Sequence, residues 1–346
     1  MKKIKRIGIC TSGGDCSGLN TVIYAIVRAC ESKNIETYGI FNGAYGLLYP
    51  DLKYIKLTLK DFKTQFSPMR AGGTILKSAN ADTRKQDNMK ERLQQGIKEL
   101  KLDSLILIGG DGSAMIVSEL IQGTDINLII IPKTIDNDTP ITDYSIGFDT
   151  ARSICMDALD KIQTTAYSHD RVMILEVMGR NTGHLALHTA IAGGADICLI
   201  PELKYDIKNI VNKLEKIKKN GVDHALIVVA EGCKPIENDT DNDNCGFGNY
   251  LSKKLKQEGI SNRATVLGYI QRGGSPTAYD RITASIFAIH ALKILLEGKT
   301  NRLVILKNGE ASNIDLFDAV SSGQRIIEPN NQLLITAKEL GIYIGE

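Results

Sequence analysis

Residues 6–30 read RIGICTSGGDCSGLNTVIYAIVRAC, and the fold can be predicted outward from this stretch. Residues 6–11 are mainly apolar and run into a glycine-rich turn, which is typical of a buried β-strand. The next segment has the apolar spacing of a helix with one buried face, at Leu19, Val22, Ile23, Ile26 and Val27. We therefore predict a strand, a glycine turn and a helix, in that order.

The same alternation continues along the chain. Further helical patterns occupy residues 84–100 and 207–219. Short apolar strands are expected at residues 105–108, 128–131, 172–177, 197–200, 225–230 and 303–306. Strands that are apolar on both faces and separated by helices indicate mainly parallel sheets sandwiched between helices, an α/β fold with Rossmann-like domains. Ligands of such folds bind beyond the carboxyl ends of the strands.

The amino-acid composition excludes several classes of function. The 346 residues suit two packed domains, and 43% hydrophobic and 24% charged residues are ordinary for a globular protein. The net charge of +2 and the absence of Trp argue against nucleic acid or an anionic membrane as partner. No stretch approaches the length of a membrane span or of a signal peptide. The seven cysteines show no CxxC pair, so we expect reduced thiols and a cytoplasmic protein.

Two glycine loops follow predicted strands. In residues 13–18, GGDCSG, glycines would let the backbone approach a phosphate at a helix N-terminus, although a simple tight turn would also fit. In residues 109–113, GGDGS, a carboxylate between glycines can hold Mg²⁺ beside a polyphosphate, or it can merely cap a helix. Neither loop is a Walker A motif or GxGxxG.

Residues 132–138, PKTIDND, place two carboxylates two positions apart at a strand end. One of them can accept a proton from a sugar hydroxyl that attacks phosphorus, and the other can orient that base. An Asx-type loop is the alternative. Because the glycine loops accompany this segment, we favour the catalytic interpretation.

The remaining polar residues divide into two groups. Arginine matches a phosphate dianion through paired hydrogen bonds, and four arginines flank strand ends or glycine turns: Arg171, Arg180, Arg263 and Arg272. His184 and His188 are four apart on a predicted helix, but they lack the intervening Glu of HExxH and a third ligand. We interpret them as helix-packing residues and not as a metal pair.

Taken together, the motifs resemble those of the A-type phosphofructokinase family. The segments TSGGDCSGLN, AGGTILKSAN, IGGDGS, PKTIDND, YSIGFDTA, SHDR, EVMGR, AEG and RATVLGYIQRGGSPTAYDR occur in that family's order over residues 7–281. The resemblance implies phosphorylation of fructose 6-phosphate at its C1 hydroxyl by ATP and Mg²⁺. It also implies two similar α/β domains with the active site between them. We expect a donor domain of residues 1–138 plus about 251–300, and a sugar domain of 139–250 plus about 301–346.

The resemblance also implies roles for individual residues. The donor phosphates would contact Gly14, Asn80, Ala81, Gly110, Asp111, Gly112 and Ser113, with Asp111 as the Mg²⁺ ligand. The catalytic residues would be Asp136, as general base, Thr134 and Arg180. Contacts to fructose 6-phosphate would come from Thr134, Ile135, Asp136, Met178, Gly179, Arg180, Glu231, Tyr269, Ile270, Gln271 and Arg272. Arg171 and Arg263 would reach the sugar phosphate from a neighbouring subunit of a homodimer or homotetramer.

The sequence departs from the usual ATP-dependent pattern at several positions. Asn80 replaces an arginine that bridges donor and acceptor phosphates, a role that Arg84 would have to supply, and Tyr269 replaces a histidine. Gly112 accompanies ATP in this family, whereas Lys133 accompanies pyrophosphate, a combination found in a mixed-substrate branch. We expect ATP as the donor, because an anion at position 112 would clash with and repel the α-phosphate.

Three alternatives remain open. A pyrophosphate-dependent fructose 6-phosphate phosphotransferase would use the same residues. A GGDG kinase acting on NAD or diacylglycerol would lack the combination of PKTIDND, MGR and QRGG. A noncatalytic nucleotide-binding subunit is disfavoured by Asp111 and Asp136, although Asn80 leaves it open.

Overall fold

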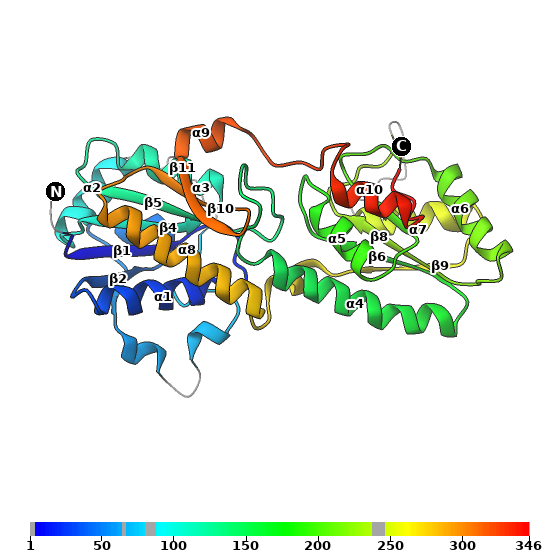
Figure 1. Ribbon diagram of the computed structural model, residues 1–346, viewed down its shortest axis with the longest axis horizontal. Coiled ribbons are helices and arrows are strands. Elements are labelled where there is room, and N and C mark those ends of the chain that lie inside the picture. The colour runs from blue at the N-terminus through cyan, green and yellow to red at the C-terminus, as the bar shows by residue number, and fades with distance from the viewer. Residues whose placement is uncertain (1–3, 64–66, 80–87, 237–245, 346) are drawn as a thin grey trace. The chain divides into compact units, whose positions relative to one another are not determined.

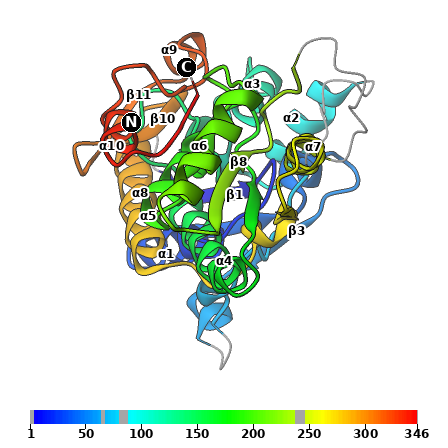
Figure 2. The same ribbon diagram turned by 90° about the vertical axis from the view of Figure 1, so that its right-hand side faces the viewer.

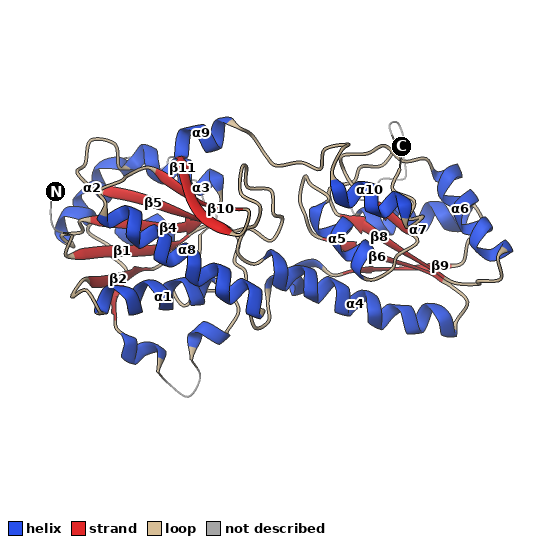
Figure 3. Ribbon diagram, viewed as in Figure 1, coloured by secondary structure: helices blue, strands red, loops and turns tan. Residues whose placement is uncertain are grey.

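The computed structural model describes residues 4–63, 67–79, 88–236 and 246–345, and at position 111 it describes the backbone alone. The chain forms two compact units. The first comprises residues 1–134, 139–150 and 272–324, and the second comprises residues 135–138, 151–271 and 325–346. Each unit is built around one β-sheet covered by helices (Figures 1 and 3).

The sheet of the first unit has the strand order β11-β10-β5-β4-β1-β2-β3. The strands are β1 (Arg6–Thr11), β2 (Glu36–Ile40), β3 (Tyr54–Leu57), β4 (Ser104–Gly109), β5 (Asn127–Pro132), β10 (Arg302–Lys307) and β11 (Glu310–Asp315). The inner strands pair in parallel, whereas β3 and β11 join antiparallel at the two edges. The central strand β4 is buried at every position, as expected for a sheet covered on both faces.

Two sets of helices cover this sheet. Helices α1 (Leu19–Glu31) and α8 (Ala278–Leu296) pack against each other, as Figure 1 shows. On the other face, the apolar sides of α2 (Met89–Glu99), α3 (Asp111–Leu120) and α9 (Leu316–Ser321) form one buried cluster with strand side chains such as Leu105 and Ile130. Short 3₁₀-helices occupy η1 (Gly43–Leu47), η2 (Leu59–Phe62) and η3 (Pro68–Arg70).

The sheet of the second unit has the order β7-β8-β6-β9, all parallel. Its strands are β6 (Val172–Val177), β7 (Ile197–Leu199), β8 (Ala225–Ala230) and β9 (Asn262–Val266). Its helices are α4 (Phe148–Ser168), whose first turn belongs to the first unit, α5 (His184–Ala192), α6 (Ile207–Lys219), α7 (Phe247–Gln257) and α10 (Gln332–Glu339). The 3₁₀-helix η5 (Gly268–Arg272) ends where the chain returns to the first unit. In Figure 2 the helices α4, α5 and α6 of this unit can be followed around β8.

The α/β fold with mainly parallel, helix-covered sheets is confirmed. The helix expected over residues 84–100 begins at Met89 among the described residues, and positions 84–87 lie outside them. The expected unit bounds differ from the observed ones at four places: residues 135–138 and 251–271 belong to the second unit, and residues 139–150 and 301–324 belong to the first. Residues 301–324 belong to the first unit because β10 pairs with β5, and residues 251–271 belong to the second because β9 pairs with β6.

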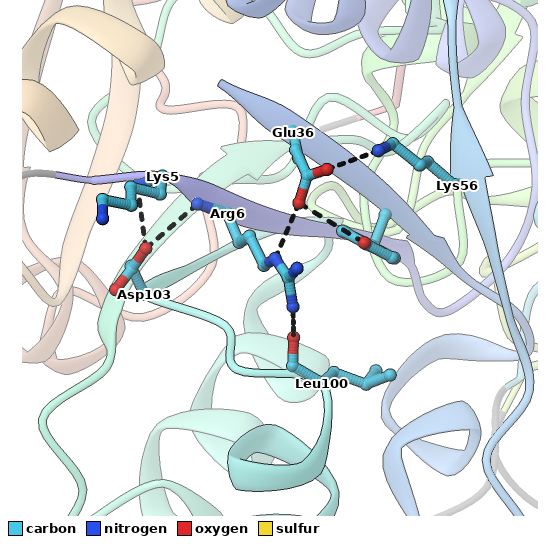
Figure 4. A network of polar contacts seen from close by, with 7 residues as sticks. Lys5, Arg6, Glu36, Lys56, Leu100 and Asp103 are labelled. Atoms are coloured by element: carbon cyan, nitrogen blue, oxygen red, sulfur yellow. Dashed lines mark hydrogen bonds and ion pairs between the residues drawn. The ribbon is translucent and has the colours of Figure 1, made fainter. Parts of the chain in front are cut away.

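A polar network fixes the amino-terminal edge of the first sheet (Figure 4). The Arg6 guanidinium donates to Glu36 at 2.7 Å, and Lys56 donates to the other oxygen of the same carboxylate. Hydrogen bonds from Lys56 and Arg6 lower the pKa of Glu36. The Asp103 carboxylate accepts from the backbone N–H groups of Lys5 and Arg6 at 2.8 and 3.0 Å. These contacts join β1, β2, β3 and the turn before β4 at the edge opposite the glycine loops.

Candidate active site

Three sequence motifs meet at the carboxyl edge of the first unit's sheet. Strands β1, β4 and β5 are parallel neighbours, so the segments that follow them leave the sheet side by side. The N–H of Ser12 donates to the Ile108 carbonyl at 3.0 Å, and the N–H of Lys133 donates to the Gly109 carbonyl at 3.2 Å. The loops expected to bind the donor are therefore adjacent, as strand-end ligand sites require.

The loop after β1 needs its glycines for conformation and for close contact. Gly13 and Gly18 have φ angles of 83° and 105°, in the region that favours glycine. A Cβ atom at Gly14 would lie 2.5 Å from an Arg272 guanidinium nitrogen. Two side chains also form hydrogen bonds with this loop. Arg272 donates to the Asp15 carbonyl at 3.1 Å, and Lys133 donates to the Gly14 carbonyl. Arg272, expected at the sugar, thus contacts the glycine loop of the first unit.

The loop after β4 leads directly into a helix. Gly110 has an extended conformation and precedes α3, whose first residue is Asp111. A helix start presents free N–H groups and a positive partial charge, both of which favour an anion. A Cβ at Gly112 would meet nothing within 4 Å, so this position has open space around it. Asn80 and Ala81, also expected at the donor, lie outside the described residues, as does Arg84.

The segment after β5 carries the expected base. Thr134 is partly buried and belongs to the first unit, where its carbonyl accepts from Ser145 at 2.8 Å. Ile135 and Asp136 belong to the second unit and are 1% and 9% exposed. The Asp138 carbonyl accepts from the N–H of Arg325 at 2.9 Å. The two carboxylates of this segment therefore belong to the second unit.

In the second unit, the expected sugar-binding residues gather at the carboxyl ends of β6 and β8. The Glu231 carboxylate accepts from the N–H of Arg180 at 2.9 Å. Gly179 has a φ of 140°, and Arg180 has a φ of 53°, so this turn is tightly constrained. A Cβ at Gly232 would lie 1.8 Å from the Arg180 carbonyl, which explains the glycine after Glu231.

The segment after β9 joins the same edge. The Gln271 side chain is 1% exposed, and its carbonyl oxygen accepts from the N–H of Met178 at 3.0 Å. Tyr269 and Ile270, in contrast, are 81% and 69% exposed. The structure thus brings Met178 and Gln271 into direct contact, with Gln271 buried as a support.

Two of the expected residues lie elsewhere on this sheet. Arg171 precedes β6, and Arg263 pairs with Met173 near the amino end of that strand. Strand β6 has six residues, so its two ends are roughly 20 Å apart at about 3.3 Å per residue. Arg171 and Arg263 therefore do not join Met178–Arg180 within one copy of the second unit.

The histidines and cysteines are structural features among the described residues. The buried His184 ring contacts the Arg325 carbonyl through Nε2 at 3.1 Å, and burial lowers its pKa to about 4. His188 contacts Arg152 at 3.3 Å. The six cysteines that the structure describes are free and buried. No helix in the described ranges is both long and apolar enough to cross a membrane.

Comparisons with known proteins identify the family of this chain. Residues 6–295 match the family model described as phosphofructokinase. The ATP-dependent 6-phosphofructokinase of Thermosynechococcus vestitus is 44% identical over 350 residues, covering 99% of this chain and 93% of that protein. The ATP-dependent 6-phosphofructokinase 2 of a Nostoc species is 41% identical over 357 residues, covering 99% of each.

A solved structure shows the same fold. The phosphofructokinase from Saccharomyces cerevisiae superposes with a TM-score of 0.80 at 27% identity. The match covers 92% of this chain but 45% of the yeast chain, which is much longer. By the family match and by its curated relatives, this chain is a member of the phosphofructokinase family.

Proposed function

We propose that this chain transfers the terminal phosphoryl group of ATP to the C1 hydroxyl of fructose 6-phosphate in the cytoplasm, yielding fructose 1,6-bisphosphate. The observation that carries the proposal is the meeting of the Gly13–Gly18, Gly110–Ser113 and Lys133–Thr134 segments at one sheet edge, in a chain of this family. The curated relatives compared above are named as ATP-dependent enzymes.

The donor phosphates bind the backbone of the first unit. Gly14, Gly110, Gly112 and Ser113 supply N–H groups at the start of α3 and in the adjacent loop, and glycine allows a phosphate to come close. Asn80 and Ala81 complete the expected donor set.

Mg²⁺ fits this donor site as a metal that arrives with the nucleotide. Among the described side chains, no group of three or more His, Cys, Asp or Glu could enclose a metal ion. Mg²⁺ held largely by phosphate oxygens and waters needs only one or two protein carboxylates. Asp111, at the first position of α3, is suited to be that ligand. When bound, the ion neutralises charge on the transferring phosphoryl group.

Asp136 acts as the general base on the sugar hydroxyl. Its low exposure limits competition from water, and Thr134 in the same segment can donate to a phosphoryl oxygen. Arg180 balances negative charge on the reacting groups, and Ile135, Met178, Gly179 and Glu231 shape the sugar site with Tyr269, Ile270 and Arg272. Gln271 contributes by fixing Met178. Asp136→Asn should lower kcat by about 10²- to 10⁴-fold while leaving the fold intact.

Arg171 and Arg263 serve a neighbouring subunit in this proposal. Their position at the amino ends of β6 and β9 keeps them from the Met178–Arg180 edge of their own chain. A homodimer or homotetramer would allow a second copy to present them to the sugar phosphate.

The combination of Gly112 and Lys133 favours the mixed-substrate branch, with ATP as the preferred donor. The open space around Gly112 leaves room for a nucleotide. The Lys133 ammonium group, in contrast, already donates a hydrogen bond to the Gly14 carbonyl. The decisive experiment is a coupled assay with fructose 6-phosphate, run first with ATP and then with pyrophosphate. Turnover with ATP supports the proposal. Turnover with pyrophosphate alone would identify the pyrophosphate-dependent phosphotransferase instead.

A further inference from the structure

A cavity opens beside the glycine loop of the first unit. It has a volume of about 520 Å³, and its wall consists of Gly13, Gly14, Asp15, Gly72, Gly73, Thr74, Lys77 and Ser78. Two backbone segments, residues 13–15 and 72–78, thus face the same space. Lys77 is the single cationic residue of this wall, and Asp15 is its single acidic one.

Lys77 has a backbone conformation that lysine seldom adopts. Its φ is 56°, in the left-handed region where a β-carbon is disfavoured and glycine is the default residue. Residues in such strained conformations are more frequent at ligand sites. They persist only where the surrounding structure holds the backbone in that conformation. Lys77 combines this conformation with a place in the wall of the cavity.

Hydrogen bonds fix Lys77 against the glycine loop. The Thr11 hydroxyl, at the end of β1, donates to the Lys77 carbonyl at 2.7 Å. The Ser78 hydroxyl donates to the Gly13 carbonyl, and the N–H of Gly13 donates to the Ala79 carbonyl at 3.1 Å. The lysine backbone is therefore tied to β1 on one side and to Gly13 on the other.

The ammonium group of Lys77 is available for a ligand. It makes no ion pair or side-chain hydrogen bond with another residue in the described ranges, and the side chain is exposed. Among the residues that the structure describes, Lys133 and Arg272 also lie beside the loop, and they donate to the Gly14 and Asp15 carbonyls. Residues 71–81, AGGTILKSANA, contain one lysine and no arginine. Among the described residues of the cavity wall, Lys77 is therefore the cation that is available to bind a polyanion.

We propose that Lys77 is a donor-binding residue, whose ammonium group binds the polyphosphate of the phosphoryl donor in this cavity. The inference rests on the proposed function and adds a specific cation to it. An ammonium bound to phosphate forms a charge-assisted hydrogen bond, which is stronger than a bond between neutral groups.

Lys77→Gly separates this role from a structural one. Glycine adopts a positive φ without strain, so the variant should melt at the same temperature as the wild type or higher. Its Kd for MgATP and for inorganic tripolyphosphate, measured calorimetrically without sugar, should rise by roughly 10- to 100-fold, which corresponds to losing one charge-assisted hydrogen bond. Lys77→Arg should bind both probes more tightly than Lys77→Gly does.

Lys101→Gly is the matched control. Lys101 is also an exposed lysine with a positive φ, 52°, but it follows α2 and takes no part in the cavity wall. Its replacement should likewise keep or raise the melting temperature, and it should leave both Kd values unchanged. Wild-type affinity of Lys77→Gly for both probes would overturn the inference.

The design separates this inference from the proposed function. If the wild type phosphorylates fructose 6-phosphate and Lys77→Gly binds both probes normally, only the role of Lys77 fails. If the wild type shows no phosphoryl transfer, the proposed function fails, and tripolyphosphate binding by the same variants still decides whether Lys77 binds polyphosphate. A wild type that binds neither probe would refute both.

Discussion

The buried carboxylate of Asp280 accepts both the backbone N–H and the hydroxyl of Thr150, at 2.8 and 2.5 Å. Its other oxygen accepts from the N–H of Gly147 at 3.0 Å. Asp280 is 0% exposed, and burial raises its pKa despite these bonds. The residue thus joins the first turn of α8 to the start of α4, inside the first unit.

Asp280→Asn should destabilise the fold strongly. The amide would turn an N–H₂ group toward N–H donors, leaving buried polar groups unsatisfied, at a cost of about 2–4 kcal/mol in unfolding free energy. Thr150→Val removes one hydroxyl and should cost about 1 kcal/mol. Urea unfolding measures both values. Asp157→Asn on the exposed side of α4 is the control, and a similar small loss for Asp280→Asn would contradict the assigned role.

Gly112→Asp should lower the use of ATP. A side chain at this position meets open space, so the fold should tolerate it, but a carboxylate would repel donor phosphates at the start of α3. We expect kcat/KM for ATP to fall by roughly tenfold or more, from like-charge repulsion. Gly112→Ala, which adds the β-carbon without charge, should stay close to the wild type. Wild-type ATP kinetics for Gly112→Asp would refute the electrostatic and steric argument.

His184 should make stability depend on pH below neutrality. Burial first, and then the charge of Arg325, lower its pKa from 6.5 to about 4 in the folded state. The unfolded chain therefore binds more protons than the folded chain between these values, and stability falls as the pH falls through this window. From pH 7 to pH 5 the loss from this residue should be about 2 kcal/mol.

Urea unfolding at pH 7, 6 and 5 tests this expectation. His184→Gln keeps a donor for the Arg325 carbonyl and removes the titration, so its stability should vary less over this range. His169→Gln, at an exposed position after α4, is the comparison variant. Parallel pH profiles for the wild type and His184→Gln would refute the assignment.

The sequence predicted the buried strands well and the more exposed strands poorly. Strands β4, β6 and β8 are buried at every position, and their apolar runs mark them plainly. Strands β2 and β3, partly or largely exposed, carry no such signal, and neither do β9 and β11. The positions of these strands in their sheets are set by pairing between segments far apart in the sequence. The division of the chain into units depends on the same long-range pairing.

The candidate site shows the same limit. The convergence of the loops after β1, β4 and β5 follows from parallel strands, so the sequence was sufficient to predict it. The contact between Arg272 and the Asp15 carbonyl joins residues 257 positions apart, and no local pattern indicates it. Lys77 was missed because its positive φ is a property of the folded loop. A signal was nevertheless present, a lone lysine in the glycine-rich segment 71–81.

Mixed oligomers should reveal whether Arg171 acts on a neighbouring subunit. Asp136→Asn removes the proposed base, and Arg171→Ala removes a proposed phosphate ligand, so each variant alone should be nearly inactive. If Arg171 is donated across subunits, a dimer of the two variants contains one site with both residues intact. Random pairing of equal amounts should then restore roughly one quarter of wild-type activity, since half the dimers are mixed and half their sites are complete.

The control pair is Arg171→Ala with Arg263→Ala. Both arginines would be donated by the same neighbour, so every site in their mixed oligomer lacks one of them and activity should stay low. Co-expression with two affinity tags isolates the mixed species for a fructose 6-phosphate assay. No recovery in the Asp136→Asn and Arg171→Ala oligomer would mean that Arg171 acts within its own chain. That result would require Arg171 to reach the sugar site from the far end of β6, roughly 20 Å away along a strand of six residues.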